Sequence, residues 1–415
     1  MKKILKAILP PFVLSVYHFS LAFLAAVLYF YPSKKIAVIA VTGTKGKSST
    51  LEYLNAIAEA AGMRTALAST IRFKIGTDSK PNLLRQTQPG RFFLQRFLSR
   101  AVQDGCTIAF IEMTSEGARQ HRHRFIDLDA LIFINLAPEH IESHGSLEAY
   151  QNAKFELGKQ LARSHKRPRY MVANADDEQG NRYLSLPVEH LLPFSLSGAT
   201  PFESSEHGGY FTFGGTKIEV RLPGEFSLKN ALASATLMNA LGFPITAIVS
   251  GIASLTKIPG RTEEINEGQA FPVIVDYAHT PDSLRALYSA YRTRRKICVL
   301  GSTGGGRDLW KRPAMGAIAD ELCDTIILTN EDPYDEDPQS IVDSIARGIT
   351  HKKPEIIMDR RAAIARAIEL ARASDAVLIT GKGTDPTIQL ARGKSIPWSD
   401  ADVAREELRK IQKAH

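Results

Sequence analysis

From Ile36 onward, short runs of apolar residues alternate with longer stretches in which apolar and polar positions are mixed. The apolar runs are Ile36–Val41, Ile108–Met113, Ala130–Leu136 and Tyr170–Ala173. Their length and continuity are typical of strands buried on both faces, and the stretches between them are long enough for helices. The pattern predicts an α/β fold with a doubly wound, mostly parallel central sheet covered by helices on both sides.

The alternation of apolar runs with mixed stretches changes at two places along the chain. Residues 194–223 are glycine-rich with alternating segments, which predicts a small antiparallel hairpin before a helix at 227–242. After Pro259-Gly260-Arg261 a second series of strands begins. Its members are Pro272–Val275, Ile297–Leu300, Thr325–Thr329 and Ala376–Thr380. We therefore predict a central domain over 34–257 and a second, Rossmann-like α/β domain over 258–415.

The chain begins with a hydrophobic segment, residues 1–33. No Lys, Arg, Asp or Glu lies between Lys6 and Lys34, and residues 8–31 are long enough to cross a bilayer of about 30 Å as a helix. We expect this segment to associate with a membrane. A full span, a helix on the membrane surface, a re-entrant hairpin and a helix packed on the protein all remain open.

Charge and cysteine content narrow the function classes. The net charge of +8 and a pI near 9.2 permit anionic partners. No run of Arg and Lys with interleaved aromatic residues is present, so we expect no nucleic-acid partner. Cys106, Cys298 and Cys323 form no closely spaced pair, which excludes a disulfide scaffold and a thiolate zinc site and favours a reducing compartment.

The strongest chemical signal follows the first predicted strand. Residues 42–50 read TGTKGKSST, and a helix is predicted from Leu51. A glycine loop between a strand and a helix N-terminus presents backbone N–H groups to a polyphosphate. Lys47 is placed to reach the β- and γ-phosphates, and the Ser48 hydroxyl to bind Mg²⁺. We expect ATP to contact Gly43, Thr44, Lys45, Gly46, Lys47, Ser48 and Ser49.

Several further motifs occur in a fixed order behind this loop. They are IEMTS at 111–115, QHR at 120–122, NLAPEH at 135–140, YQNAK at 150–154, and DYAHTP at 276–281. Together with TGTKGKSST they resemble the Mur ligase family, most closely its third-residue-adding branch, the UDP-N-acetylmuramyl-tripeptide synthetases. The resemblance spans about residues 36–390. Folylpolyglutamate synthase and cyanophycin synthetase are relatives of the same class.

The resemblance implies a metal and carboxyl-activation site. Mg²⁺ would be held by Ser48, Glu112 and His140, with Lys154 as a carbamylated lysine beside it. Lys47, Glu112, His140 and Lys154 would carry the chemistry, and a second group of residues would contact the acyl substrate. That group is Thr87, Ser115 and Arg122.

The resemblance also assigns roles in the second domain. Asn230, Arg261 and Asp276 would complete the ATP site. Four residues would bind substrate on this side, with Arg307 on the α-carboxylate of the incoming amino acid, a bidentate task suited to arginine. They are His279, Arg307, Asp332 and Asp385.

This chain departs from the family pattern at several positions. Glu139 stands where Asp is usual, 331–334 reads EDPY where diaminopimelate-adding enzymes have DNPR, and 381–385 reads GKGTD in place of GKGHE. The amino acid that is added is therefore open. Only residues 1–35 precede the first strand, where full-length members carry a UDP-binding domain. Either a partner protein supplies UDP recognition, or the acyl substrate is a lipid-linked analogue of the UDP-muramoyl peptide.

Taken together, the sequence predicts an ATP-dependent acid–amino-acid ligase of peptidoglycan precursor synthesis, with ATP and Mg²⁺ as cofactors. A carboxylate is activated as an acyl phosphate and then attacked by the amine of an amino acid. We expect the enzyme at the cytoplasmic face of a membrane, attached through residues 8–31. The alternatives are a folylpolyglutamate- or cyanophycin-type ligase, a membrane-tethered P-loop ATPase, and a binding protein with an inactive site.

Overall fold

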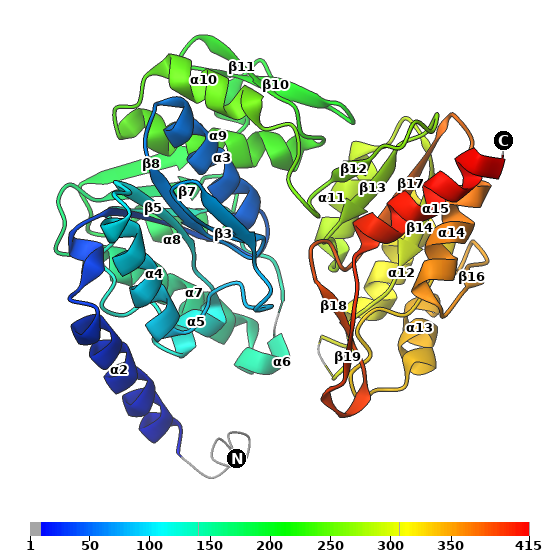
Figure 1. The fold of residues 1–415 in the computed structure, drawn as a ribbon, viewed down its shortest axis with the longest axis horizontal. Coiled ribbons are helices and arrows are strands. Elements are labelled where there is room, and N and C mark those ends of the chain that lie inside the picture. Colours follow the sequence, from blue (N-terminus) through cyan, green and yellow to red (C-terminus); the bar gives the residue numbers. More distant parts are fainter. Residues whose placement is uncertain (1–9, 140, 307, 415) are drawn as a thin grey trace.

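Two α/β bodies stand side by side in the computed structural model, which describes residues 10–139, 141–306 and 308–414 (Figure 1). The N-terminal body contains the elements from β1 to α10, and the C-terminal body those from β12 to α15. Each body has its own sheet and its own buried core. The domain limits at 33/34 and 257/258 stay predictions.

The sheet of the N-terminal body has eight strands in the order β4-β3-β2-β5-β1-β6-β7-β8. The six strands from β2 to β8 in this order pair in parallel, and β3 and β4 add an antiparallel edge. The strands are β1 (Ala37–Thr42), β2 (Thr65–Ala68), β3 (Arg72–Ile75), β4 (Asp78–Pro81), β5 (Ile108–Glu112), β6 (Ala130–Phe133), β7 (Tyr170–Asn174) and β8 (His190–Phe194). Because Val41 is in register with Glu112, the carboxyl end of β5 lies beside the loop that follows β1.

Helices cover both faces of this sheet, as the buried strands predicted. Alternate residues of β1 enter different cores: Ile39 and Val41 join one, and Val38 and Ala40 join the other. The first face carries α3 (Lys47–Ala60), α9 (Glu225–Ala240) and α10 (Ile245–Ser254), and the second carries α4 (Arg91–Gln103), α5 (Ser115–Arg119), α7 (Leu147–Ala162) and α8 (Gly180–Leu184). The doubly wound architecture is confirmed.

Residues 194–223 form the small antiparallel unit predicted there, with one strand more than a hairpin. Its sheet order is β11-β10-β9, with bounds β9 (Glu203–Ser205), β10 (Gly208–Phe213) and β11 (Thr216–Val220). Phe211 and Ile218 are fully buried in the core that α9 and α10 share. The unit therefore extends the core over one face of the main sheet.

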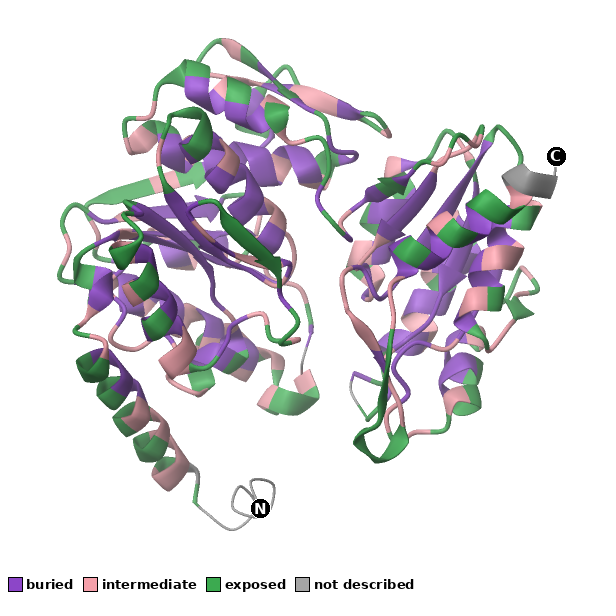
Figure 2. Cartoon of the chain, in the orientation of Figure 1, coloured by how far each residue is buried: buried purple, intermediate pink, exposed green. Residues whose placement is uncertain are grey.

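The C-terminal body repeats the α/β arrangement with a six-stranded sheet, β12-β13-β17-β14-β15-β16, in which only β12 is antiparallel. The strands are β12 (Glu263–Ile265), β13 (Val273–Asp276), β14 (Arg295–Leu300), β15 (Thr325–Leu328), β16 (Glu355–Ile356) and β17 (Asp375–Thr380). The helices are α11 (Pro281–Ala290), α12 (Lys311–Leu322), α13 (Pro338–Ala346), α14 (Arg360–Leu370) and α15 (Asp400–Ala414). Figure 2 shows the buried strands of both sheets between helices that are exposed on their outer sides.

Two cysteines of the C-terminal body are joined, which the sequence did not indicate. Cys298 on β14 and Cys323 after α12 form a disulfide across 25 residues, and both are buried. Cys106 is free and buried. The pairing depends on α12 packing against β14, a contact that cysteine spacing does not encode.

The hydrophobic N-terminal segment forms helix α2 (Pro11–Leu28), followed by a 3₁₀ turn at Pro32–Lys34. Within residues 10–139, 141–306 and 308–414, no helix combines the length and the apolar character needed to cross a bilayer. The predicted full span over residues 8–31 is therefore not confirmed. One side of α2 packs against the protein, because Ala22, Ala25 and Ala26 are buried.

Candidate functional site

The phosphate loop lies between β1 and α3, and a side chain from the neighbouring strand holds it in shape. The Asn135 side chain accepts hydrogen bonds from the backbone N–H groups of Thr44 (3.1 Å) and Lys45 (2.9 Å). Gly46 caps α3 with φ 83°, and a Cβ there would lie 2.4 Å from Asn230 Oδ1. The loop is therefore fixed in a conformation that requires glycine, directly against α9.

The amino groups of two lysines converge on the loop. Lys47 Nζ donates to the carbonyl oxygens of Gly43 and Thr44, each at 3.0 Å, and Lys154 Nζ donates to Gly43 O at 2.8 Å. Burial lowers the pKa of Lys47, and burial together with Lys47 lowers the pKa of Lys154 well below its ordinary value. An anion bound at the loop would stabilise the charged form of both amines.

Ser48 and Glu112 form the oxygen pair at which the sequence predicted a metal. Ser48 Oγ donates to Glu112 Oε1, and Glu112 Oε2 accepts from the backbone N–H of Thr70 at 3.1 Å. Both side chains are buried at the carboxyl edge of the sheet. A hydroxyl and a carboxylate are hard oxygen donors, and Mg²⁺ binds such groups together with phosphate oxygens. The residues present fit that ion.

His140 and Lys154 complete the predicted metal site. His140 lies outside the described residues, so its position beside Glu112 stays a prediction. In the part of the chain that the structure describes, no three His, Cys, Asp or Glu side chains gather as a metal cluster. Lys154 reaches the same loop as Ser48 and Glu112 through its contact with Gly43.

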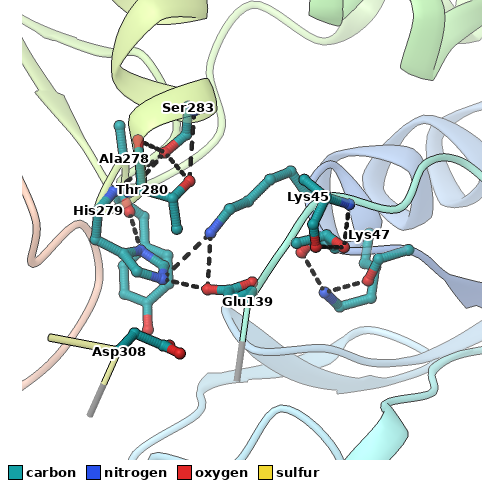
Figure 3. Close-up of polar contacts among 12 residues, drawn as sticks. Lys45, Lys47, Glu139, Ala278, His279, Thr280, Ser283 and Asp308 are labelled. Carbon is teal, nitrogen blue, oxygen red and sulfur yellow. Dashed lines mark hydrogen bonds and ion pairs between the residues drawn. The ribbon is translucent and has the colours of Figure 1, made fainter. Parts of the chain in front are cut away.

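A polar cluster joins the two bodies above the loop (Figure 3). Lys45 Nζ lies 3.1 Å from Glu139 Oε1 and 3.2 Å from His279 Nε2, and His279 Nε2 lies 2.9 Å from Glu139 Oε1. His279 Nδ1 donates to the carbonyl of Tyr277 at 2.6 Å. Burial and the adjacent Lys45 ammonium lower the pKa of His279 to about 4, so the ring is neutral near pH 7. Neutral Nε2 can then accept a hydrogen bond from Lys45.

A cavity of about 390 Å³ lies between the bodies next to the phosphate loop. Lys45, Gly46 and Asn230 line it from the N-terminal body, and Arg261 and Asp276 line it from the C-terminal body. Its apolar lining includes Leu222, Phe226, Ile258, Ala278 and Leu287. A mostly apolar cavity with a few polar groups, open to a phosphate loop, suits the base and sugar of a nucleotide.

Asp276 and Arg261 are held in place at the cavity wall. Asp276 accepts from the backbone N–H groups of Thr262 (2.7 Å) and Ala278 (2.6 Å), and burial raises the pKa of its carboxyl. The guanidinium of Arg261 lies over the Tyr277 ring, 4.5 Å from its centroid. The structure thus brings Asn230, Arg261 and Asp276 to one cavity, as the sequence predicted.

The predicted acyl-substrate residues lie on a separate part of the N-terminal body. The Thr114 backbone N–H donates to Gln88 Oε1 at 2.9 Å, and Arg122 Nη1 donates to the carbonyl of Gln88. Ser115 is buried in the first turn of α5, and Thr87, adjacent to Gln88, is half-buried. Gln88 therefore joins the segments that carry Thr87, Ser115 and Arg122.

Two of the predicted amino-acid residues, Asp332 and Asp385, belong to a second ion-pair cluster between the two bodies. Asp332 Oδ1 accepts from Lys382 Nζ at 2.9 Å, and Asp332 Oδ2 accepts from Arg85 Nη2 at 2.8 Å. Asp385 Oδ2 lies 3.5 Å from both Lys382 and Arg85. Glu331 is buried beside them, and burial raises its pKa. Arg307 lies outside the described residues, so its role stays a prediction.

Sequence reasoning missed three members of this cluster. Arg85 comes from the N-terminal body and crosses to Asp332, and no local spacing relates the two. Lys382 and Glu331 lie inside the GKGTD and EDPY segments, which were considered only as departures from a family pattern. The available signal was their position, because Glu331 adjoins Asp332 and Lys382 lies three residues before Asp385.

Two family models match the chain. The Mur ligase middle domain matches residues 41–238, and the Mur ligase glutamate ligase domain matches residues 260–383.

Curated relatives cover nearly the whole chain. A UDP-N-acetylmuramoyl-L-alanyl-D-glutamate–2,6-diaminopimelate ligase of Geobacillus kaustophilus is 34% identical over 93% of this chain and 81% of its own length. A UDP-N-acetylmuramyl-tripeptide synthetase of Treponema denticola is 33% identical over 92% of this chain and 78% of its own length.

Solved structures show the same fold. A UDP-N-acetylmuramoyl-L-alanyl-D-glutamate–2,6-diaminopimelate ligase aligns with a TM-score of 0.61 at 29% identity, over 91% of this chain and 79% of that one. Folylpolyglutamate synthase of Mycobacterium tuberculosis aligns with a TM-score of 0.70 at 15% identity, over 91% and 97%, which shows a shared fold alone.

The fold and the site thus define a two-body α/β enzyme with a phosphate loop at an inter-body cavity. With two family models over most of its length and relatives above 30% identity, the chain belongs to the Mur ligase family. It is an ATP-dependent ligase of peptidoglycan synthesis.

Proposed function

We propose that this enzyme joins an amino acid to the carboxylate of a UDP-muramoyl peptide at the expense of ATP. The observation that carries the proposal is the inter-body cavity of about 390 Å³. It lies next to the loop that Lys47 and the buried Lys154 contact, where Ser48 meets Glu112. A plain ATPase needs only the loop. The cavity also has a wall from the C-terminal body, which a two-substrate ligase needs in order to bring the second substrate to the first.

ATP would bind with its phosphates on the backbone N–H groups of residues 43–49 and its nucleoside in the cavity near Asn230, Arg261 and Asp276. Half-buried Asp276, at the carboxyl end of β13, is placed to accept from a ribose hydroxyl. Ser48 and Glu112 would hold Mg²⁺, which supplies positive charge to the phosphates. Lys45 and Lys47 would lie beside the bound phosphates.

The chemistry requires a carboxylate to approach a triphosphate, although both are anions. In the proposed first step a substrate carboxylate oxygen bonds to the γ-phosphorus and the bond to the ADP oxygen breaks. Lys47 and the loop N–H groups stabilise the charge on the phosphoryl oxygens as it is transferred. In the second step the amine nitrogen attacks the acyl carbon, a proton leaves the nitrogen, and inorganic phosphate departs. Closure of the two bodies excludes water, which would otherwise hydrolyse the acyl phosphate.

We propose that Lys154 carries a carbamate in the active enzyme. Burial lowers its pKa well below its ordinary value, which favours the neutral amine, the form that reacts with CO₂. The product would place an anionic oxygen pair close to the loop and to the metal ligands. Carbon-13 NMR of enzyme equilibrated with ¹³CO₂ should show one carbamate resonance that is absent from Lys154→Ala.

The acyl substrate would lie along Thr87, Ser115 and Arg122, and the amino acid at Arg307, Asp332 and Asp385, with His279 between the bodies. The carboxylates of Glu331, Asp332 and Asp385 lie together where the amine is proposed to bind. We propose the cytoplasmic face of the membrane as the place of reaction, because ATP is there. A partner that supplies UDP recognition belongs to the same proposal.

The test measures phosphate release from ATP by the full chain, with UDP-MurNAc-dipeptide as acyl donor and a panel of amino acids. Release that requires both the dipeptide and one amino acid supports the proposal and names the amine. Release that needs neither substrate contradicts it and favours a plain ATPase. Release with a glutamate-terminated folate in place of the dipeptide would favour a polyglutamate ligase.

A further inference from the structure

Helix α2 presents an apolar stripe to solvent along its whole length. Phe12, Val16, Phe23, Leu24 and Leu28 have exposed fractions between 48% and 69%, and Phe30 beyond the helix is 78% exposed. The five helical residues follow one another by four, seven, one and four positions, which places them on one side of the helix. We call this set of six the outer face of α2. A surface helix normally turns charged residues outward, but residues 11–28 contain none.

The opposite side of α2 is fixed to the N-terminal body. Ala22, Ala25 and Ala26 are at most 1% exposed. Ser15 Oγ lies 2.7 Å from His121 Nε2, and Arg91 Nη2 donates to His18 Nδ1 at 2.8 Å. Ser15 and His18 therefore contact the body, and the outer face points away from it. Figure 1 shows α2 projecting below α4, and Figure 2 shows its outer side exposed.

The charged residues that flank α2 in the sequence have one sign. The first 51 residues contain no Asp or Glu, whereas Lys2, Lys3 and Lys6 precede the helix in the sequence and Lys34 and Lys35 follow it. Lys34 and Lys35 are exposed, and Lys34 Nζ lies 5.0 Å from the centroid of the Tyr31 ring. An apolar stripe between basic ends matches the interface of a bilayer with anionic headgroups.

A second copy of the chain fits this face less well. In an antiparallel pair of α2 helices, the lysines before one helix would face Lys34 and Lys35 of the other. A parallel pair would place identical lysines together. Either arrangement brings like charges together with no acidic residue from the first 51 positions to offset them.

We propose that the outer face of α2 docks on an anionic lipid surface, with the helix lying in the plane of the interface and the N-terminal body held against it. The contacts of α2 with His121 and Arg91 connect this face to the segment that carries Arg122. Docking would therefore hold that end of the N-terminal body close to the membrane. The proposal does not depend on which substrates the enzyme joins.

The test is flotation of the full chain with vesicles. Vesicles of phosphatidylglycerol and phosphatidylcholine in equal parts should carry the protein, and vesicles of phosphatidylcholine alone should carry much less. Val16→Glu with Leu24→Glu should weaken partitioning by about 100-fold, because two apolar side chains no longer enter the interface. Lys34→Gln with Lys35→Gln should weaken it by about 25-fold on anionic vesicles.

The matched control is Ile245→Glu. Ile245 is 38% exposed on a different surface, at the first turn of α10, where an acidic side chain suits the helix N-terminus. This variant should float like the wild type. All variants should keep the wild-type melting temperature and nucleotide binding, which shows that they are folded.

Three results would overturn the proposal. The first is no flotation of the wild type with anionic vesicles. The second is equal flotation of the Val16→Glu/Leu24→Glu variant. The third is a concentration-dependent dimer, seen by light scattering without lipid, that this double variant abolishes, because the face would then be an interface between two copies.

Discussion

The phosphate loop and the Asp332 cluster are built in different ways. At the phosphate loop, Lys47 and Ser48 belong to one nine-residue segment, and Glu112 is brought beside it by strand register within one sheet. In the Asp332 cluster, Asp332 and Lys382 of the C-terminal body meet Arg85 of the N-terminal body. The loop, Ser48 and Glu112 are thus held within one body. The groups proposed to select the amine depend on how the two bodies meet.

The contrast separates two kinds of effect that a substitution can have. Changes at the loop should reduce the chemical step whichever amino acid is supplied. Changes at the Asp332 cluster should act mainly on the use of the amino acid.

The largest effect is expected from Lys47→Met. It removes the buried ammonium that stabilises the transferred phosphoryl group, and loss of one such donor typically reduces kcat by about 10²–10³-fold. Amine-dependent phosphate release measures it. Lys159→Met is the control, because Lys159 is a surface lysine on α7 paired with Glu156. A loss below tenfold for Lys47→Met would contradict the role proposed for the loop.

A smaller but still large effect is expected from Glu112→Gln. The amide keeps the shape of the side chain but lacks the charge that Mg²⁺ requires, so the Mg²⁺ concentration for half-maximal activity should rise about 10–100-fold. Glu116→Gln, at an exposed position on α5, should leave it unchanged. An unchanged Mg²⁺ dependence in Glu112→Gln would remove this residue from the metal site.

In the Asp332 cluster, Arg85→Met should raise KM for the amino acid by about 10–100-fold, since it removes a charge-assisted hydrogen bond to buried Asp332. KM for ATP should change less than twofold. Arg366→Met is the control, because its ion pair with Glu355 is exposed and worth little. Equal changes in both KM values would mean that Arg85 acts on closure of the bodies and not on the amine.

The smallest effect concerns the pH dependence of the free energy of unfolding, which depends on a residue outside both sites. Burial lowers the pKa of His123 to about 3 from an ordinary value of 6.5. The unfolded chain therefore binds more protons than the folded one between these values, so the stabilisation is complete above pH 6.5 and is lost as pH falls toward 3. The slope contributed by His123 is about 1.4 kcal/mol per pH unit.

Chemical denaturation at pH 6.5, 5.5 and 4.5 measures this slope. His123→Leu should make the free energy of unfolding less dependent on pH by that amount. His165→Leu should not, because the His165 side chain is 85% exposed. A pH dependence unchanged in His123→Leu would show that another group carries it.

The same contrast explains what the sequence could predict. Buried strands such as Ala37–Thr42 and Asp375–Thr380 are read directly from continuous apolar runs, and a loop whose ligands are consecutive carries its own signature. Strand register then placed Glu112 beside that loop without further information.

What the sequence did not predict depends on tertiary packing. The Arg85–Asp332 pair and the Cys298–Cys323 disulfide each join residues whose separation in sequence carries no pattern. The apolar residues of α2 left open whether the segment spans a membrane, lies on its surface or packs on the protein. An apolar run does not reveal that Ala22, Ala25 and Ala26 are buried while Phe23 and Leu24 are exposed.

The central claim is that a substrate carboxylate attacks the γ-phosphate of ATP at this loop. It is tested most directly with UDP-MurNAc-dipeptide labelled with ¹⁸O in its free carboxylate, followed by mass spectrometry of the released phosphate. The account predicts one ¹⁸O atom in the phosphate for each amide bond formed, because the acyl phosphate passes one carboxylate oxygen to the leaving phosphate. Phosphate that carries no ¹⁸O would show that water, and not the carboxylate, attacks ATP, and would contradict the account.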